Sequence, residues 1–315
     1  MAVQFCLNLK TQSHQGPSQR SPERSVRGAG FSLQGAGGIG TVILVHGLAG
    51  TPHEMRGLGA FLHQQGYAVV CPRLANHGEP IEILSKTTWE ECYRSVQDAL
   101  TGLDAVSHPG PIFIGGLSLG ALLALLLAEE FPSRILGVSC LSPTLFYDGW
   151  NVPWTRYLLP LAYGTPLKHF FYFKEEPPYG IKNTAIRQRI HRYYEKARLD
   201  DIDQVAQYGY PYFPVSLLCE LHFLVNHLRK RLRHITTPVQ LIQANDDDMT
   251  SVKNSQFVYD HIRSDIKELV LLHDSYHIIT ADQERHVVAR HVGDFFNRLR
   301  THTPSAPPET SAGRV

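Results

Sequence analysis

The sequence predicts an α/β protein with a mostly parallel sheet covered by helices. From Thr41 onward, short β-branched or apolar runs alternate with amphipathic helical stretches, which is typical of βαβ units. The chain has 315 residues and 43% apolar content, enough to bury one large core. The alternation stops near residue 146 and resumes at Pro238. A doubly wound sheet with one long insertion is therefore expected.

The individual elements follow from this alternation. Strands are expected at 41–46, 67–72, 111–115 and 135–141, with helices at about 53–65, 88–106 and 119–130. After the interruption, strands are expected at 238–243 and 268–273, with helices at about 252–263 and 282–298. Two pairs, Thr51 with Glu54 and Thr87 with Glu90, have the spacing of capping boxes.

The domain organisation follows from composition. Residues 31–145 and 237–300 are expected to form the α/β core, and residues 146–236 a lid inserted before the next strand. Two helices are predicted within the lid, at 184–197 and 215–232. Residues 1–30 and 301–315 contain too little apolar surface to offset ordering entropy and are expected to be disordered tails.

Composition also excludes several classes of partner. A net charge of +1 gives no field that would attract nucleic acid. The longest apolar run, Ala121–Ala128, is too short to span a bilayer, so no stable membrane insertion is expected. Five dispersed cysteines without a C-x-x-C pattern indicate free thiols, and the N-terminus has no signal-peptide pattern. We expect a cytoplasmic protein acting on a small molecule; its oligomeric state stays open.

The strongest motif is Gly116-Leu117-Ser118-Leu119-Gly120, between a predicted strand and a predicted helix. This arrangement is the nucleophile elbow, in which a sharp turn exposes a serine above the sheet edge. Glycines at its flanks are needed because side chains there would collide. Ser118 is the candidate nucleophile.

A second motif, His46-Gly47-Leu48-Ala49-Gly50, follows the first clear strand. Acyl transfer needs two backbone N–H groups directed at the oxyanion. One is expected from Leu119, the residue after the nucleophile, and the other from Leu48 in this loop. His46 is expected to brace the loop.

The remaining partners follow from chain order, which in this elbow-containing architecture is Ser, then an acid, then His. Asp246, Asp247 and Asp248 stand together after the strand that resumes the alternation, at the edge where open α/β sheets bind ligands. His277 follows the next strand on a short polar turn and is the preferred base, ahead of His77 and His273. Order alone leaves the three acids open.

These motifs together resemble one branch of a known superfamily. The segments HGLAGTPHEMRGL, PRLANHG, TTWEE, GLSLG, QANDDDMT and SYHIIT are similar to bacterial carboxylesterases and monoacylglycerol lipases of the α/β-hydrolase fold, related to serine aminopeptidase-like hydrolases. The similarity covers about residues 40–300. It implies a triad of Ser118, an acid of the Asp246–Asp248 cluster and His277, with Leu48 as an oxyanion donor. Matching the family's acid-acid-Met ending to Asp247-Asp248-Met249 selects Asp247, with Asp248 and Asp246 in reserve.

One segment departs from the family pattern. Where the family often has Gly-His-Gly, this chain has Asn76-His77-Gly78, which affects the expected shape of the pocket rim and leaves the triad unchanged. Two other patterns are set aside. The glycine-rich run 35–40 precedes a strand and is expected to be a loop, and the basic residues at 187–198 are expected to form one face of a lid helix.

The expected activity is hydrolysis of a carboxylic ester, with a short or medium acyl chain or a monoacylglycerol-like substrate, through an acyl-enzyme. No cofactor and no metal ion are expected, since the histidines His286 and His291 are five residues apart and off one helix face. Lid residues are candidates for an acyl pocket: Trp150, Trp154, Phe170, Phe171 and Phe173.

Three alternatives keep the same triad: an aminopeptidase-like amidase, a thioesterase and an acyltransferase. An aminopeptidase would need carboxylates that recognise an α-amine, and Glu175 with Glu176 is the obvious pair in the lid. A different class, a non-catalytic binding protein on this scaffold, also stays open because a fold does not dictate a function.

Overall fold

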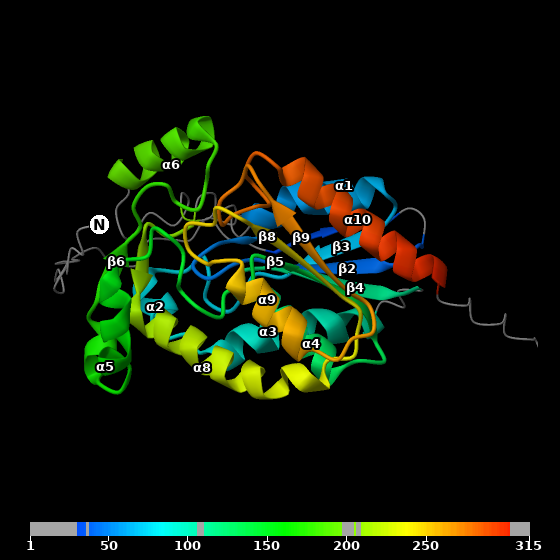
Figure 1. The fold of residues 1–315 in the computed structure, drawn as a ribbon, viewed down its shortest axis with the longest axis horizontal. Helices are drawn as coiled ribbons and strands as arrows, with labels where there is room; N and C mark the ends of the chain where they lie inside the picture. Colours follow the sequence, from blue (N-terminus) through cyan, green and yellow to red (C-terminus); the bar gives the residue numbers. More distant parts are fainter. Residues whose placement is uncertain (1–29, 36–37, 106–109, 197–204, 206–208, 303–315) are drawn as a thin grey trace, which may run out of the picture.

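The computed structural model describes residues 30–35, 38–105, 110–196, 205 and 209–302. Within them, a seven-stranded sheet has the strand order β1-β3-β2-β4-β5-β8-β9 (Figure 1). Neighbouring strands are parallel except β1, which runs antiparallel to β3. The predicted mostly parallel sheet is confirmed. Its strands are β1 (Phe31–Leu33), β2 (Thr41–Val45), β3 (Ala68–Cys71), β4 (Ile112–Leu117), β5 (Ile135–Leu141), β8 (Val239–Ala244) and β9 (Lys267–Leu272).

Helices cover both faces of this sheet. Figure 1 shows α1 (Arg56–Gln64) and α10 (Arg285–His302) on one face, with α3 (Trp89–Ala105), α4 (Leu119–Glu130), α8 (Val215–Arg231) and α9 (Lys253–His261) on the other. Each face has its own apolar cluster. The doubly wound arrangement of a three-layer α/β protein is thus present. None of the described helices has the length and apolar content needed to cross a membrane.

Helix α4 lies at the centre of the larger apolar cluster. Its residues from Leu119 to Ala128 are all buried, because the helix is apolar on every side and must lie within the protein. Each fully buried leucine contributes roughly 1.5–3 kcal/mol. The chain passes from β4 into α4 through Ser118, so the packing of this helix fixes the position of that residue.

The insertion between β5 and β8 contains the two helices expected there. They are α6 (Thr184–Lys196) and α8, which confirms the patterns at 184–197 and 215–232. A two-stranded antiparallel sheet, β6 (Tyr172–Lys174) with β7 (Tyr212–Pro214), was not predicted. Helix α8 packs on α4 through Leu221, Leu224 and Leu228, so the end of the insertion lies on the core. The remaining short elements are α2 (Ile81–Leu84), α5 (Leu159–Tyr163) and the 3-10 turns Pro52–Met55, Trp154–Leu158, Pro166–His169 and Leu232–His234.

The expected N-terminal cap of α3 was wrong by one residue. The structure forms the capping box with Thr88 and Glu91: Thr88 N–H donates to Glu91 Oε2 at 2.9 Å, and Glu91 N–H donates to Thr88 Oγ1 at 3.3 Å. The run TTWEE satisfies the spacing in two registers, and Thr87 is used elsewhere, accepting a hydrogen bond from Asn76 Nδ2 at 3.0 Å. The last helix also ends later than expected, at His302.

Some expectations fall on residues that are not described. Most of both predicted tails, residues 1–29 and 303–315, lies outside the described residues, as do Ala36 and Gly37 of the glycine-rich run. The described part of that run joins β1 to β2 without a helix after it. It is therefore a loop, as expected.

Candidate active site

Ser118 occupies a strained turn between β4 and α4. Its backbone has φ 55° and ψ −114°, a conformation that residues with a side chain rarely adopt. The flanking glycines make the turn possible. A Cβ atom on Gly116 would lie 2.1 Å from the carbonyl oxygen of Gly120, and one on Gly120 would lie 2.3 Å from that of Val45. The strand-to-helix geometry expected of GLSLG is present.

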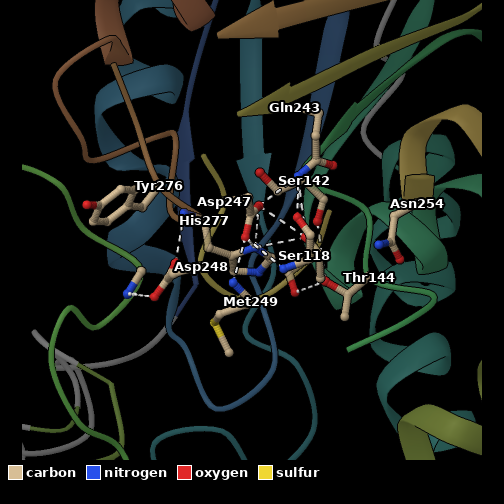
Figure 2. A network of polar contacts seen from close by, with 12 residues as sticks. Ser118, Ser142, Thr144, Gln243, Asp247, Asp248, Met249, Asn254, Tyr276 and His277 are labelled. Carbon is tan, nitrogen blue, oxygen red and sulfur yellow. Dashed lines mark hydrogen bonds and ion pairs between the residues drawn. The ribbon is translucent and has the colours of Figure 1, made fainter. Parts of the chain in front are cut away.

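The hydroxyl group of Ser118 lies 2.8 Å from Thr144 Oγ1. Thr144 itself donates to the carbonyl oxygen of Ser142 at 3.3 Å, so the consistent arrangement has Ser118 donating to Thr144. Among the described contacts the serine has no hydrogen bond to His277. Figure 2 shows Ser118 beside Thr144, with the ring of His277 close by.

His277 and Asp247 form a buried hydrogen-bonded pair. The Nδ1 atom of His277 lies 2.9 Å from Asp247 Oδ2 and 3.1 Å from Oδ1. Burial opposes protonation of the ring, but the charge and hydrogen bond of Asp247, with smaller contributions from Asp248 and Glu54, raise the pKa of His277 above its usual value. A carboxylate at Nδ1 fixes the tautomer that leaves Nε2 free to accept a proton.

Asp247 is held by its own strand-end turn. Its Oδ1 accepts the N–H groups of Met249 at 2.9 Å and Thr250 at 2.8 Å. Its Oδ2 accepts Gln243 Nε2 at 2.7 Å and Thr250 Oγ1 at 3.0 Å. These donors stabilise the ionised carboxylate and fix its direction.

The two reserve acids lie elsewhere. Asp246 is exposed and pairs with Lys182 at 3.6 Å. Asp248 is buried but turned away from Ser118 in Figure 2. Its carboxylate accepts the N–H groups of Gly180 at 3.2 Å and His277 at 3.4 Å, and burial raises its pKa to about 6. Asp248 thus joins the insertion to the loop after β9 that carries His277, here called the histidine loop.

The other two candidate histidines also lie apart from this pair. His273 is exposed and bonds Asn245 Nδ2 at 2.9 Å. His77 is fully buried on another loop, where burial lowers its pKa to about 4. Of the three histidines considered, only His277 contacts an acid of the Asp246–Asp248 cluster.

The loop after β2 lies against the elbow. A Cβ atom on Gly47 would lie 3.6 Å from Ser118 Cβ, and Leu48 lines the same cavity as Ser118. Among the described residues, neither the N–H of Leu48 nor that of Leu119 has a hydrogen-bond acceptor. His46 is buried below: its Nδ1 donates to Gly47 O at 3.0 Å and its Nε2 accepts Leu74 N–H at 3.2 Å. The neutral ring therefore braces this loop, as expected.

Two adjoining cavities lie above the sheet edge. The cavity of about 60 Å³ is lined by Ser118 and His277. A larger and mainly apolar cavity, of about 150 Å³, is formed chiefly by the insertion. They share lining residues, namely Tyr147, Glu175, Tyr179, Phe213 and Met249. Of the five aromatic residues expected in an acyl pocket, only Phe173 lines either cavity; Trp150, Trp154 and Phe170 are exposed.

Sequence reasoning missed several residues that hold these groups. Thr144, Gln243 and Thr250 contact the serine or the acid directly, and Asp282 accepts Tyr276 N–H at 2.8 Å beside the histidine. Polar residues are common near strand ends, so no pattern distinguished them. No group of three metal-ligating side chains occurs within the described residues, and Cys71, Cys92, Cys140 and Cys219 are buried free thiols.

Comparison with known proteins decides the family. The model of the family "Serine aminopeptidase, S33" matches residues 38–284, most of the chain. The chain belongs to the serine aminopeptidase S33 family. This S33 family member is 28% identical to the thermostable monoacylglycerol lipase of Bacillus sp. (strain H-257) over 81% of its own length and 89% of the relative's. It is 27% identical to a carboxylesterase of Bacillus subtilis (strain 168), covering 84% and 94%.

Solved structures give the same fold. A structure reported with LipS and LipT, two metagenome-derived lipolytic enzymes, superposes on this S33 family member with a TM-score of 0.70 at 22% identity, covering 87% of this chain and 98% of that one. The monoacylglycerol lipase of Paleococcus ferrophilus gives 0.68 at 20% identity, with the same coverage. At these identities the likeness establishes the α/β-hydrolase fold.

Proposed function

We propose that this protein hydrolyses carboxylic esters through an acyl-enzyme. Ser118 is the nucleophile, His277 the general base and Asp247 the carboxylate that orients it. The observation that carries the proposal is the buried hydrogen bond between His277 Nδ1 and Asp247 Oδ2, at 2.9 Å, in a ring that lines the same cavity as the elbow serine. Family membership and the esterase and lipase names of the relatives support it.

The chemistry follows in two halves. When an ester occupies the cavity, the Ser118 hydroxyl leaves Thr144, its oxygen attacks the carbonyl carbon, and its proton passes to His277 Nε2. Asp247 stabilises the imidazolium, and the N–H groups of Leu48 and Leu119 bind the oxyanion. The imidazolium then protonates the departing alcohol. Water attacks the acyl-enzyme by the same route and restores Ser118.

The larger cavity suits the acyl part of the substrate. Its walls include Val152, Leu159, Phe173 and Leu218, and it adjoins the cavity of Ser118. We therefore assign a short or medium acyl chain, as in a monoacylglycerol-like ester, to this cavity, with residues 146–236 acting as the lid. Cytoplasmic location stays a prediction from cysteine usage, and a small ester is the proposed partner.

Labelling with a fluorophosphonate tests the proposal. We expect wild-type protein to be labelled at Ser118 and Ser118→Ala to remain unlabelled, as shown by mass spectrometry of the modified peptide. Wild-type protein that neither reacts with the probe nor cleaves a nitrophenyl ester would be a non-catalytic member of the fold. Such a result would falsify the proposed activity.

The amidase alternative depends on Glu175 and Glu176. Glu175 lines both cavities, but burial raises its pKa to about 8, which disfavours the ionised form that would recognise an ammonium group. We expect nitrophenyl butyrate to be cleaved much faster than an aminoacyl anilide. The rate of cleavage of a matching thioester tests the thioesterase alternative. Transfer of the acyl group to an added alcohol tests the acyltransferase alternative.

A further inference from the structure

The carboxyl group of Glu54, a half-buried residue, lies inside the loop that follows β2, and it has no role in the reaction proposed above. Glu54 Oε2 accepts the N–H of Gly47 at 3.1 Å, and the carboxyl group also accepts a hydrogen bond from the backbone of Thr51. A Cβ atom on Gly50 would lie 2.0 Å from Glu54 Oε1. The carboxyl group therefore fills the interior of the 47–51 loop and holds both of its ends.

This loop needs to be held, because it contains a strained residue. Ala49 has φ 55°, in the left-handed region that a residue with a side chain rarely adopts. Such a conformation persists only where surrounding contacts determine it. On the outer side, Tyr210 N–H donates to Ala49 O at 3.1 Å; on the inner side the contacts come from Glu54.

The contacts of this loop also determine the direction of one peptide group. The carbonyl oxygen of Gly47 accepts hydrogen bonds from His46 Nδ1 at 3.0 Å and from Gly50 N–H at 3.2 Å. Because a trans peptide is planar, the N–H of Leu48 points opposite to that carbonyl. Glu54 accepts the N–H of Gly47, and the carbonyl oxygen of Gly47 accepts the two hydrogen bonds just described. Hydrogen bonds therefore hold both backbone polar groups of Gly47, the residue before Leu48.

We propose that Glu54 is a positioning residue: its carboxyl group holds the 47–51 loop so that the N–H of Leu48 faces the oxyanion formed at Ser118. This inference rests on the proposed ester hydrolysis. The choice of a carboxyl group has a chemical reason, since the backbone N–H groups of Gly47 and Thr51 both donate to it and a carboxylate presents only acceptors. A glutamine side chain offers one acceptor oxygen, and its NH₂ group opposes the second donor.

Burial of this carboxyl group agrees with such a role. Desolvation raises the pKa of Glu54 to about 7, although the hydrogen bonds from Gly47 and Thr51 and the charge of His277 oppose the rise. Desolvation of a carboxyl group in the cavity of Ser118 therefore costs free energy. Capping of a helix does not by itself require a carboxyl group in that cavity. Glu91 caps α3 by the same spacing and lines neither cavity.

The experiment compares Glu54→Met, Glu54→Gln and the matched capping variant Glu91→Met. The readouts are kcat and KM for nitrophenyl butyrate, and the affinity for a trifluoromethyl ketone, whose hemiketal oxyanion uses the same N–H donors. Glu54→Met should lower kcat by about 100-fold with KM within about threefold, and weaken ketone binding by a similar factor, as when one oxyanion donor is lost. Glu54→Gln should lose less than Glu54→Met because one acceptor remains. Glu91→Met should keep both constants.

Three results would overturn the inference: a folded Glu54→Met enzyme with near wild-type kcat, a loss confined to KM, or equal losses in Glu54→Met and Glu91→Met. If Glu54→Met does not fold, Glu54→Gln decides, and unchanged kcat with unchanged ketone affinity rejects the role. Fluorophosphonate labelling of the wild-type protein separates this failure from failure of the proposed function. An unlabelled, inactive wild type refutes the function itself, whereas a labelled wild type beside a fully active Glu54→Met variant refutes only the role of Glu54.

Discussion

The sheet edge and the insertion differ in how far they bury their apolar side chains. Helix α4 buries all of its leucines, whereas the insertion exposes Trp154 to 71% and Leu161 to 74%. Polar contacts differ too. Asp247 at the sheet edge accepts several buried hydrogen bonds, while the larger cavity next to it is mainly apolar. In the reaction proposed above, the core would therefore fix the reacting groups and the insertion would supply a surface for the substrate.

Two carboxylates accept hydrogen bonds from both the insertion and the loop that carries His277. Asp248 accepts Gly180 N–H from the insertion and His277 N–H from the core. Asp282 accepts the N–H groups of Lys182 and Asn183, at 2.7 and 2.8 Å, as well as that of Tyr276. A change in the insertion can thus reach the histidine loop through these two carboxylates. If the core holds the reacting groups and the insertion binds the substrate, substitutions in the core should lower kcat the most.

The largest expected effect is at Ser118. Removing a covalent nucleophile lowers kcat by on the order of 10⁶-fold even when the oxyanion donors remain. Ser118→Ala should therefore abolish turnover of nitrophenyl butyrate, with an unchanged circular dichroism spectrum as the control for folding. Turnover close to the wild-type rate would show that the elbow is not the reacting group.

Asp247→Asn should lower kcat by about 10⁴-fold, because an amide favours the wrong tautomer of His277. Asp246→Asn should cost far less, since Asp246 is exposed and turned to Lys182. Steady-state kinetics on both variants measure the difference. Equal losses, or a larger loss at Asp246, would move the acid to another residue of the cluster.

The same contrast explains what the sequence could predict. The bounds of β5 and α4 are those expected. Each element is a long apolar or β-branched run between turn residues, so the pattern allows only one position for its two ends. The strand-to-helix motif and the order of Ser118, Asp247 and His277 placed the site at the carboxyl ends of the strands. These are the parts of the chain where local pattern and buried surface agree.

The remaining parts depend on tertiary contacts that leave no local pattern. β1, β6 and β7 have three residues each, too short for any period to be read. The cap of α3 was misplaced because TTWEE fits two registers, and tertiary contacts such as that of Thr87 with Asn76 distinguish them. Glu54 was recognised as part of a capping box, but its contact with Gly47 joins residues on opposite sides of a turn. Thr144 reaches Ser118 from the loop after β5, which nothing in the sequence indicated.

Stability should also distinguish the two regions. Leu123 in α4 is fully buried, so Leu123→Ala should lower the free energy of unfolding by about 2–5 kcal/mol. Leu161→Ala in the insertion should change it by less than about 0.5 kcal/mol because that side chain is 74% exposed. Urea unfolding, compared at constant m-value, measures both. A loss at Leu161 as large as that at Leu123 would mean that the insertion is packed against something in solution.

The smallest expected effect is a shift in the pH profile, and it tests the link between the two regions. A general base works when unprotonated, and the net effect on His277 is a pKa above the usual 6.5, so kcat/KM should fall along a limb above pH 6.5 as the pH decreases. Asp248 has a pKa of about 6 and is mainly ionised in that range, where its charge favours the imidazolium. Asp248→Asn removes this charge, so the pKa of His277 should decrease and the limb should move to lower pH.

Asp246→Asn is the matched control: its carboxylate is exposed, screened by water and paired with Lys182, so the limb should stay in place. Profiles of kcat/KM from pH 5 to 9 on the three proteins decide. A flat wild-type profile would remove His277 as the base, and equal shifts in both variants would mean that the limb reports general charge and that Asp248 has no particular link to the ring.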